Sequence, residues 1–445
     1  MLLFVKYDSR KLYFNVKEKI LQSISLLISQ WFFNGENNLK LGVNIEYYPR
    51  IKKRILEESL ETIQDNRLKW DPPFFIDTKS YLDIENIQRT CEPFINDEII
   101  NIIVLGTGGS IQTLLALKHL AKKKIFPVSS SRAVELKGCL DKTTPENSVV
   151  IPISRGGETL DVNSTIGIFQ KNGYKFLGLS SKGKMHEILS EMNCPILKVP
   201  DLSGRFAGSI TNVGVVPAYL AGIKIKEFIT GLEEGYNTFM NLEINPSLEF
   251  AAFLCQLYNQ GYRIVFSMPY SKNLEGSVGL FVQEISESTG KDNKGLMGAY
   301  QSAPICQHSV LEYLLGGTKG SVIPIIWTID NENPDFKLES SIDYVNGQTA
   351  QTIVNYQADA TFQALIEQSL PCAKISIDSP NESYIGRLVS FIQSTVYYLC
   401  LLLNVNWANN PMVDIGKKIC NEALRSKISP EARKKIREDL AKDKY

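Results

Sequence analysis

The sequence has no excess of charge of either sign, because 48 lysine and arginine residues are balanced by 48 aspartate and glutamate residues. A chain without a net field is not drawn to nucleic acid or to an anionic membrane, so we expect no partner of either kind. The apolar run at the N-terminus is too short for a secretory signal, and we therefore expect a cytoplasmic protein. The most hydrophobic stretch, residues 385–405, contains Arg387, Gln393 and Ser394, which favours a buried core helix over a membrane span.

Metal-binding and disulfide patterns are also missing. The eight cysteines are scattered and include no Cys-x-x-Cys pair, and only Cys306 lies close to a histidine, His308. This arrangement does not match a zinc site, and the density of cysteine is too low for a disulfide framework. We expect reduced cysteines and no bound metal. Histidine is scarce as well, with three in the chain, which leaves few candidates for a general acid or base of that type.

The most informative stretch, residues 101–120, lacks both common nucleotide-binding signatures. It combines a predicted strand at 102–105, the turn Gly106-Thr107-Gly108-Gly109-Ser110 and an amphipathic helix from Ile111. A dinucleotide fingerprint requires a third glycine where Ile111 stands and an acidic residue about 20 positions later, and a P-loop requires Gly-Lys-Ser/Thr. Neither is present, so we expect no cofactor. Bare N–H groups at a helix N-terminus still favour an anion. Two interpretations remain open, namely a pocket for one phosphate and a tight turn without a ligand.

A second turn of the same construction follows the predicted strand at 149–154. Because parallel strands end at one edge of a sheet, the two turns can converge on one crevice. Their neutral donors suit the oxygens of a phosphate monoester better than a carboxylate. The alternative is that Ser154 and Thr159 serve only as helix caps. The phosphate interpretation predicts contacts from both turns, at Gly108, Gly109, Ser110, Ser154, Arg155, Gly156, Gly157 and Thr159.

The chain is long enough for two domains, and its hydrophobic pattern divides it into four parts. We predict a mainly helical segment, two units that alternate strand and helix, and a polar helical tail, with the boundaries 1–95, 96–242, 243–410 and 411–445. The first segment includes predicted helices at 16–33 and 51–68. Short connections between apolar strands and helices predict mainly parallel sheets that are covered on both faces. We therefore expect an α/β fold with two three-layer αβα units.

Five motifs, in one order along the chain, resemble the sugar isomerase (SIS) domain and the glucose-6-phosphate isomerase family. The segment 154–161, Ser-Arg-Gly-Gly-Glu-Thr-Leu-Asp, is similar to the phosphosugar-binding turn of SIS domains. The other four resemble isomerase signatures and are Gly204-Arg205-Phe206-Ala207, Glu287-Ser288-Thr289-Gly290-Lys291, Cys306-Gln307-His308-Ser309 and Val413-Asp414-Ile415-Gly416-Lys417. The resemblance implies two SIS-type subdomains. It also implies the reversible isomerisation of glucose 6-phosphate and fructose 6-phosphate, a step of glycolysis and gluconeogenesis.

That reaction requires a carboxylate base to move a proton between C2 and C1 of the open-chain sugar, and a cation to stabilise the enediolate that forms. The resemblance implies Glu287 as the base and Arg205 as the cation, with Gln283 and Asn410 in contact with the sugar. From the residues alone, Glu287 also suits a solvated helix end, and Arg205 also suits a surface ion pair with Asp201.

Ring opening requires a further acid/base pair. His308 stands at the start of a predicted apolar helix, and the pKa of an imidazole suits proton transfer near neutral pH. The alternative is a histidine that caps the helix. The resemblance implies Lys417 as the second ring-opening group. It also implies a homodimer in which His308 reaches the site of the neighbouring subunit, with a sugar phosphate as the small-molecule partner.

The sequence departs from the family pattern at three positions. Arg155 stands where the family commonly has lysine, Asp414 where it has glutamate, and Asn410 where it usually has glutamine. Substrate preference therefore stays open, and a dual isomerase that also accepts mannose 6-phosphate is one alternative. A non-catalytic SIS-domain sensor of sugar phosphates is another. The joint presence of a candidate base, histidine and lysine argues against the sensor.

Overall fold

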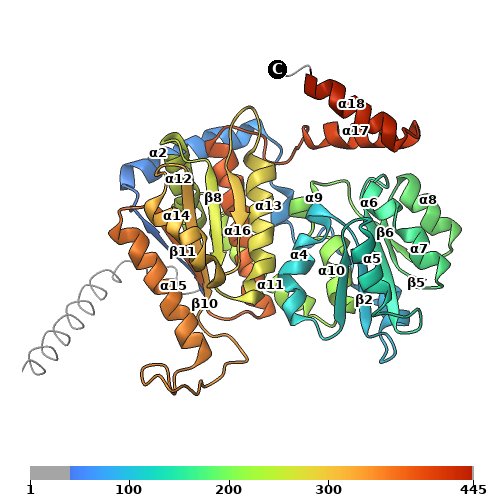
Figure 1. Cartoon of the computed structure of the whole chain (residues 1–445), viewed down its shortest axis with the longest axis horizontal. Coiled ribbons are helices and arrows are strands. Elements are labelled where there is room, and N and C mark those ends of the chain that lie inside the picture. Colours follow the sequence, from blue (N-terminus) through green and yellow to red (C-terminus); the bar gives the residue numbers. More distant parts are fainter. Residues whose placement is uncertain (1–40, 443–445) are drawn as a thin grey trace, which may run out of the picture.

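The computed structural model describes residues 41–442, which form two α/β units side by side, with a helical hairpin at the C-terminus (Figure 1). The first unit is built on a six-stranded sheet and the second on a five-stranded sheet. The helix predicted at 16–33 lies outside the described residues. The helix predicted at 51–68 is present as α2 (Lys53–Asn66).

The sheet of the first unit is parallel throughout and has the order β3-β2-β4-β6-β7, with β5 paired to β4. Its strands are β2 (Asn101–Leu105), β3 (Lys124–Val128), β4 (Ser148–Ser154), β5 (Lys175–Phe176), β6 (Gly178–Ser180) and β7 (Ile196–Leu197). Every residue of β2 is buried, and alternate residues enter different core clusters, with Ile102 and Val104 in one and Ile103 and Leu105 in the other. Because successive side chains of a strand point to opposite faces, both faces of this sheet are covered.

The helices of the first unit are shorter than predicted. Instead of one helix from Ile111 the chain forms a 3₁₀ turn, η5 (Gly108–Ser110), and then α4 (Gln112–Leu117). The helix predicted after the second glycine turn is divided into α6 (Leu160–Asn163) and α7 (Ile166–Lys171). The other helices of the unit are α5 (Ala133–Leu140), α8 (Gly183–Glu191), α9 (Gly204–Ala207) and α10 (Asn212–Leu220).

The sheet of the second unit has the order β1-β11-β10-β8-β9 and contains two strands that the sequence pattern did not indicate. These are β1 (Val43–Tyr48), which pairs antiparallel with β11 (Cys372–Ile377), and β9 (Met297–Tyr300), which pairs parallel with β8 (Ile264–Pro269). The remaining strand is β10 (Val322–Ile329). The described part of the N-terminal segment, from residue 41 on, therefore supplies an edge strand to the second unit in addition to helices.

The centre of the second unit is α16 (Glu382–Leu402), which has the length and composition of a membrane span but is 89% buried within the protein over the span-like window. It is the core helix that the sequence predicted. α11 (Ile225–Phe239) lies against α16 so closely that a Cβ on Gly231 would be 2.1 Å from the carbonyl oxygen of Ser383. α11 therefore belongs to the core around α16, although the sequence pattern placed it in the first unit.

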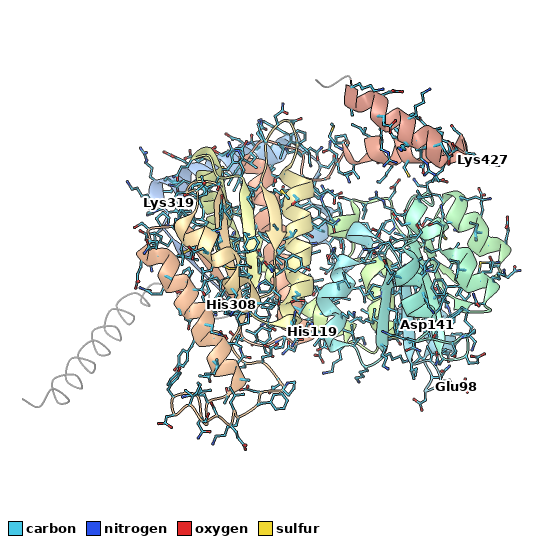
Figure 2. The ribbon with its side chains drawn as sticks, in the orientation of Figure 1. Glu98, His119, Asp141, His308, Lys319 and Lys427 are labelled. Atoms are coloured by element: carbon cyan, nitrogen blue, oxygen red, sulfur yellow. The ribbon has the colours of Figure 1, made fainter. Side chains whose placement is uncertain are left out.

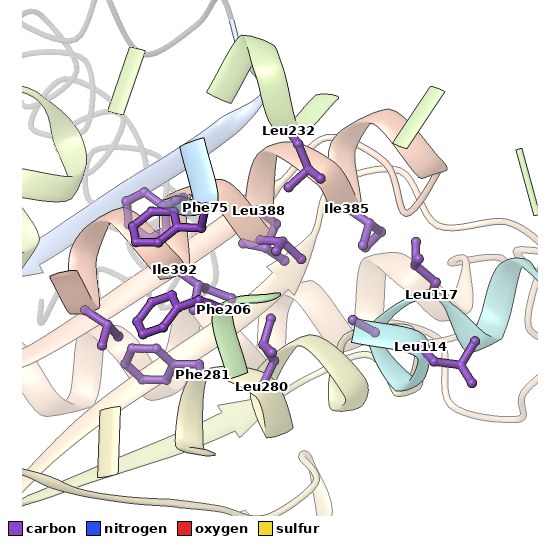
Figure 3. Close-up of a cluster of buried hydrophobic side chains, with 14 of the residues drawn as sticks. Phe75, Leu114, Leu117, Phe206, Leu232, Leu280, Phe281, Ile385, Leu388 and Ile392 are labelled. Atoms are coloured by element: carbon purple, nitrogen blue, oxygen red, sulfur yellow. The ribbon is translucent and has the colours of Figure 1, made fainter. Parts of the chain in front are cut away.

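Four further helices cover the second sheet, namely α12 (Pro246–Asn259), α13 (Glu275–Thr289), α14 (Val310–Gly316) and α15 (Ala350–Glu367). The two units share one hydrophobic core. Figure 3 shows Leu114 and Leu117 of α4 in the same cluster as Leu280 of α13 and Ile385 of α16. This continuous packing holds α13 against the first unit.

The C-terminal helical hairpin consists of α17 (Val413–Arg425) and α18 (Pro430–Lys442), which confirms that the tail is helical. No residue of α17 is buried. Figure 1 shows the hairpin standing off the two units, on the side where α9 and α6 lie.

Candidate active site

The first glycine turn lies at the carboxyl edge of the first sheet. Leu105 pairs with Pro152, so that β2 and β4 end side by side and their two turns lie next to each other, as predicted. Gly108 adopts a positive φ of 58°. A Cβ on Gly109 would lie 2.4 Å from the backbone nitrogen of Arg205, so the turn is pressed against the start of α9.

The second turn is organised by a pair of hydroxyl groups. Ser154 is buried, and its Oγ donates to Thr159 Oγ1 at 3.0 Å and accepts from the backbone nitrogen of Thr159 at 3.4 Å. The side chain of Thr159 makes no capping hydrogen bond to α6, so the capping interpretation fails for this residue. Arg155 lies 3.6 Å from Asp201 and is 40% exposed, which places its guanidinium at the rim of the turn.

Arg205 is the most buried cation at this edge, with a side chain that is 1% exposed. Its Nε donates to Ser288 Oγ at 2.7 Å, and its Nη2 donates to the carbonyl oxygen of Trp407 at 2.5 Å. Its Nη1 lies 3.3 Å from Glu287 Oε1. Burial lowers the pKa of Arg205, and the neighbouring carboxylate of Glu287 opposes that shift. The alternative of a surface ion pair with Asp201 is therefore contradicted, because Asp201 pairs with Arg155 and Lys182 instead.

Glu287 stands in the last turn of α13, where this helix of the second unit contacts Arg205 of the first unit. Its side chain is 20% exposed. Gln283 Nε2 donates to Oε2 at 3.0 Å, and Asn410 Nδ2 donates to Oε1. A Cβ on Gly108 would lie 3.4 Å from Gln283 Nε2, so this amide bridges the carboxylate and the first glycine turn. The alternative of a freely solvated helix-end carboxylate is contradicted by these contacts.

Two ionisable residues near Glu287 had no predicted role. Glu284 is fully buried, and burial raises its pKa to about 8. Lys291 is 8% exposed and donates to the carbonyl oxygen of Asn406, and burial lowers its pKa to about 8. Glu284 lies one helical turn before the predicted base, shortly after the apolar run Leu280-Phe281-Val282 of α13, and that spacing was the available signal.

His308 lies elsewhere in the chain. It ends η8 (Ile305–His308), which follows the carboxyl end of β9, whereas the Glu287 end of α13 leads into the amino end of β9. Gly298 N of β9 donates a hydrogen bond of 2.8 Å to Ser286 Oγ, which holds the Glu287 end of α13 next to β9. Within residues 41–442 the exposed side chain of His308 makes no hydrogen bond or ion pair, and Figure 2 shows it in the second unit on the side away from the hairpin. One chain does not bring His308 to Glu287.

Lys417 is also outside the group of side chains around Glu287. It lies on α17, is 64% exposed and forms an ion pair of 3.3 Å with Asp414. Asn410, which precedes α17, is the residue that connects this part of the chain to Glu287. The structure therefore brings together Arg205, Gln283, Glu287 and Asn410 beside the two turns, and leaves His308 and Lys417 apart.

The eight cysteines are all free. In the described part of the chain, no three or more histidine, cysteine, aspartate or glutamate side chains gather in a way that could hold a metal ion. The chemistry of the group around Glu287 is that of a buried cation, a partly buried carboxylate and two amides, next to turns rich in N–H and O–H donors. This combination can bind a phosphate and move a proton on an adjoining carbon chain.

Comparison with known proteins gives relatives along most of the chain, although no family model matches it. The chain is 26% identical over 340 residues to a glucose-6-phosphate isomerase of Methanocaldococcus jannaschii, which covers 72% of this chain and 83% of that protein. It is 25% identical over 377 residues to a glucose-6-phosphate isomerase of Campylobacter jejuni, and this match covers 79% of this chain and 91% of that protein.

Solved structures share the fold. A glucose-6-phosphate isomerase of Chlamydia trachomatis matches with a TM-score of 0.71 and 18% identity, over 90% of this chain and 92% of that one. A hypothetical protein of Thermus thermophilus matches with a TM-score of 0.74 and 19% identity, over 83% of this chain and 95% of that one. The predicted α/β fold with two mainly parallel sheets is thereby confirmed. Since the sequence relatives along about three quarters of its length are isomerases of one kind, this chain is a distant member of the glucose-6-phosphate isomerase family.

Proposed function

We propose that this phosphosugar isomerase interconverts glucose 6-phosphate and fructose 6-phosphate through ring opening and an enediolate. The observation that carries the proposal is the contact of 3.3 Å between buried Arg205 and Glu287, at the edge where two glycine turns meet. A carboxylate and a fixed guanidinium are the two groups that an aldose–ketose proton transfer requires.

The phosphate of the substrate binds at the two turns. The backbone N–H groups of the first turn, the paired hydroxyls of Ser154 and Thr159 and the guanidinium of Arg155 supply donors on neighbouring strands. Backbone N–H groups in such turns favour anions, and hydroxyl donors add neutral hydrogen bonds to phosphate oxygens. Binding at this edge directs the carbon chain toward Gln283 and Glu287.

Glu287 then removes the proton from C2 of the open-chain aldose. The electron pair of that C–H bond forms the C1=C2 double bond, and the carbonyl oxygen on C1 takes up the negative charge, which Arg205 stabilises. Glu287 returns its proton to C1, and the hydroxyl proton of O2 passes to O1 as the C2=O2 carbonyl of the ketose forms. Gln283 and Asn410, which donate to Glu287 in the free protein, are placed to turn to the sugar hydroxyls.

Ring opening is assigned to His308 of a second subunit and to Lys417. Support for a second subunit comes from the surface around His308. β9 is an edge strand of the second sheet, and Met297, Tyr300 and Ile305 beside it are exposed. An uncovered edge strand with apolar side chains is a surface that proteins normally cover. We infer a homodimer in which this surface is buried.

A coupled assay of fructose 6-phosphate conversion tests the proposal. Glu287→Gln keeps the shape of the side chain and removes the base, so activity falls by about 10²-fold or more. Glu275→Gln, at the other end of the same helix and paired with Lys272, is the matched control and keeps wild-type activity. Wild-type turnover no higher than that of Glu287→Gln would overturn the assignment. Tight binding of the sugar phosphate without turnover would favour the sensor instead, and a substrate panel separates the dual isomerase that also accepts mannose 6-phosphate.

A further inference from the structure

A second carboxylic acid lies one helical turn before Glu287 and takes no part in the reaction proposed above. Glu284 is 0% exposed. Because residues three and four positions apart share one face of a helix, its side chain lies on the face of α13 that carries Glu287 and Ser288. Arg205 contacts both of those residues, so Glu284 occupies the interior side of the Arg205–Glu287 pair.

The surroundings of Glu284 disfavour a charge. Gln393 Nε2 donates to its Oε1 at 2.9 Å, while Gln393 Oε1 accepts from Ser209 Oγ at 3.2 Å and from the hydroxyl of Tyr236. Oε2 of Glu284 has no hydrogen-bond partner anywhere in the described range 41–442. A buried carboxylate with one neutral donor and no cation in contact is less stable than the protonated acid.

The ionisable groups around Glu284 come from four helices. The opposing charge that acts on Glu284 is Arg205 of α9, and the like charge is Glu287 of α13 itself. The thiol of Cys400 on α16 and the phenol of Tyr236 on α11 also face it, and burial raises the pKa of both groups above their usual values. No side chain among these four helices neutralises Glu284 by direct contact within the described structure.

We propose that Glu284 is a positioning residue, held as an uncharged carboxylic acid behind the Arg205–Glu287 pair. In this state Glu284 does not compete for the positive charge of Arg205, which can then stabilise the enediolate. The inference rests on the proposed isomerase function. With Glu284 uncharged, one guanidinium faces one carboxylate. With Glu284 ionised, two carboxylates would share the same guanidinium, and both would repel the enediolate.

The consequence is a limit on activity at alkaline pH. As Glu284 loses its proton, the enediolate loses stabilisation that the substrate does not require, because the neutral open-chain sugar carries no charge at C1 or C2. The loss therefore falls on kcat more than on KM. A residue that served packing alone would lower kcat by the same factor at every pH.

Glu284→Gln tests this inference, with Asp330→Asn as the matched control. Asp330 follows the carboxyl end of β10, the central strand of the second sheet, and burial raises the pKa of its carboxyl as well. We expect wild-type kcat to fall tenfold per pH unit above the pKa of Glu284. In Glu284→Gln the midpoint of this alkaline fall moves upward by at least about one pH unit, and kcat at neutral pH stays within about threefold of the wild-type value. Asp330→Asn keeps the wild-type profile. An alkaline limb that is unchanged in Glu284→Gln overturns the inference.

A second measurement separates this inference from the proposed function and does not require the Glu284→Gln variant to fold. Infrared difference spectra across the alkaline range, recorded on Asp330→Asn protein, report the carbonyl band of a protonated buried carboxyl, which disappears on ionisation. We expect that band at neutral pH and its loss at the midpoint of the kcat profile. If the protein has no isomerase activity, the proposed function fails while the band still decides the charge of Glu284. Absence of the band overturns the inference.

Discussion

Replacing Arg205 by lysine separates the charge of this residue from its geometry. The guanidinium donates to Ser288, Trp407 and Asn409 at 2.7, 2.5 and 3.3 Å, and it pairs with Glu287 at 3.3 Å. A lysine ammonium keeps the charge but lacks the planar fork that reaches in several directions at once. Hydrogen bonds that involve a charged group contribute about 1.5–3 kcal/mol each. If lysine keeps two of the four contacts, the free energy of unfolding falls by at least roughly 3 kcal/mol.

The same substitution reduces catalysis through misplacement of the cation. Loss of one donor to a developing oxyanion costs about 10²–10³ in kcat, and we expect an effect of that size with a smaller change in KM. Denaturant unfolding and the coupled isomerase assay measure the two effects. Arg132→Lys, at a side chain that is 73% exposed, is the control and changes unfolding by less than about 0.5 kcal/mol. Wild-type kcat together with wild-type stability in Arg205→Lys would refute the reasoning.

Three further predictions concern the assembly, the packing of two helices and a buried amine. Mixing inactive Glu287→Gln and His308→Ala subunits restores about a quarter of wild-type activity after subunit exchange, because half of the dimers are mixed and each has one intact site; no recovery would contradict a shared site. Gly231→Ala, whose Cβ would lie 2.1 Å from a carbonyl oxygen of α16, destabilises by about 1–3 kcal/mol, whereas helical Gly138→Ala, with no atom within 4 Å, is neutral or stabilising in thermal unfolding. Burial lowers the pKa of Lys291 to about 8 from 10.5, so the unfolded state binds more protons between these values; stability relative to Lys291→Met therefore rises by roughly 3 kcal/mol over that range, and a fall would disprove the shift.

The half of the site that follows strands of one sheet was predictable from sequence. Because parallel strands end at a common edge of a sheet, the glycine turns that follow β2 and β4 were expected to lie next to each other. The pairing of Leu105 with Pro152 confirms that the two strands end side by side. The missed strands have local causes. β9 is Met-Gly-Ala-Tyr, which lacks β-branched residues, whereas the alternation in β1 (Val-Asn-Ile-Glu-Tyr-Tyr) was present but stood between two stretches that were predicted to be helical.

The contacts that join the two units could not be derived from periodicity. Nothing in the local sequence around Arg205 indicates that it is buried against Glu287 and Trp407 and not paired with nearby Asp201. Such contacts join residues about 80 to 200 positions apart in sequence, and only the packing of α13 onto the first unit decides them. Motif resemblance supplied Glu287 and Arg205 but not Glu284, because a motif names residue types and does not state which side chains are buried.

The topology of the second unit determines why His308 is absent from its own chain's site. In a parallel β–α–β unit the helix returns from the carboxyl edge to the amino edge of the sheet, so the end of α13 with Glu287 lies where β9 begins. A residue that follows β9 emerges at the opposite edge. The four residues of β9 alone separate the two edges by about 13 Å, at about 3.3 Å per residue. No rotation of the His308 side chain closes that distance, so the role proposed for His308 in the reaction at Glu287 requires a second copy of the chain.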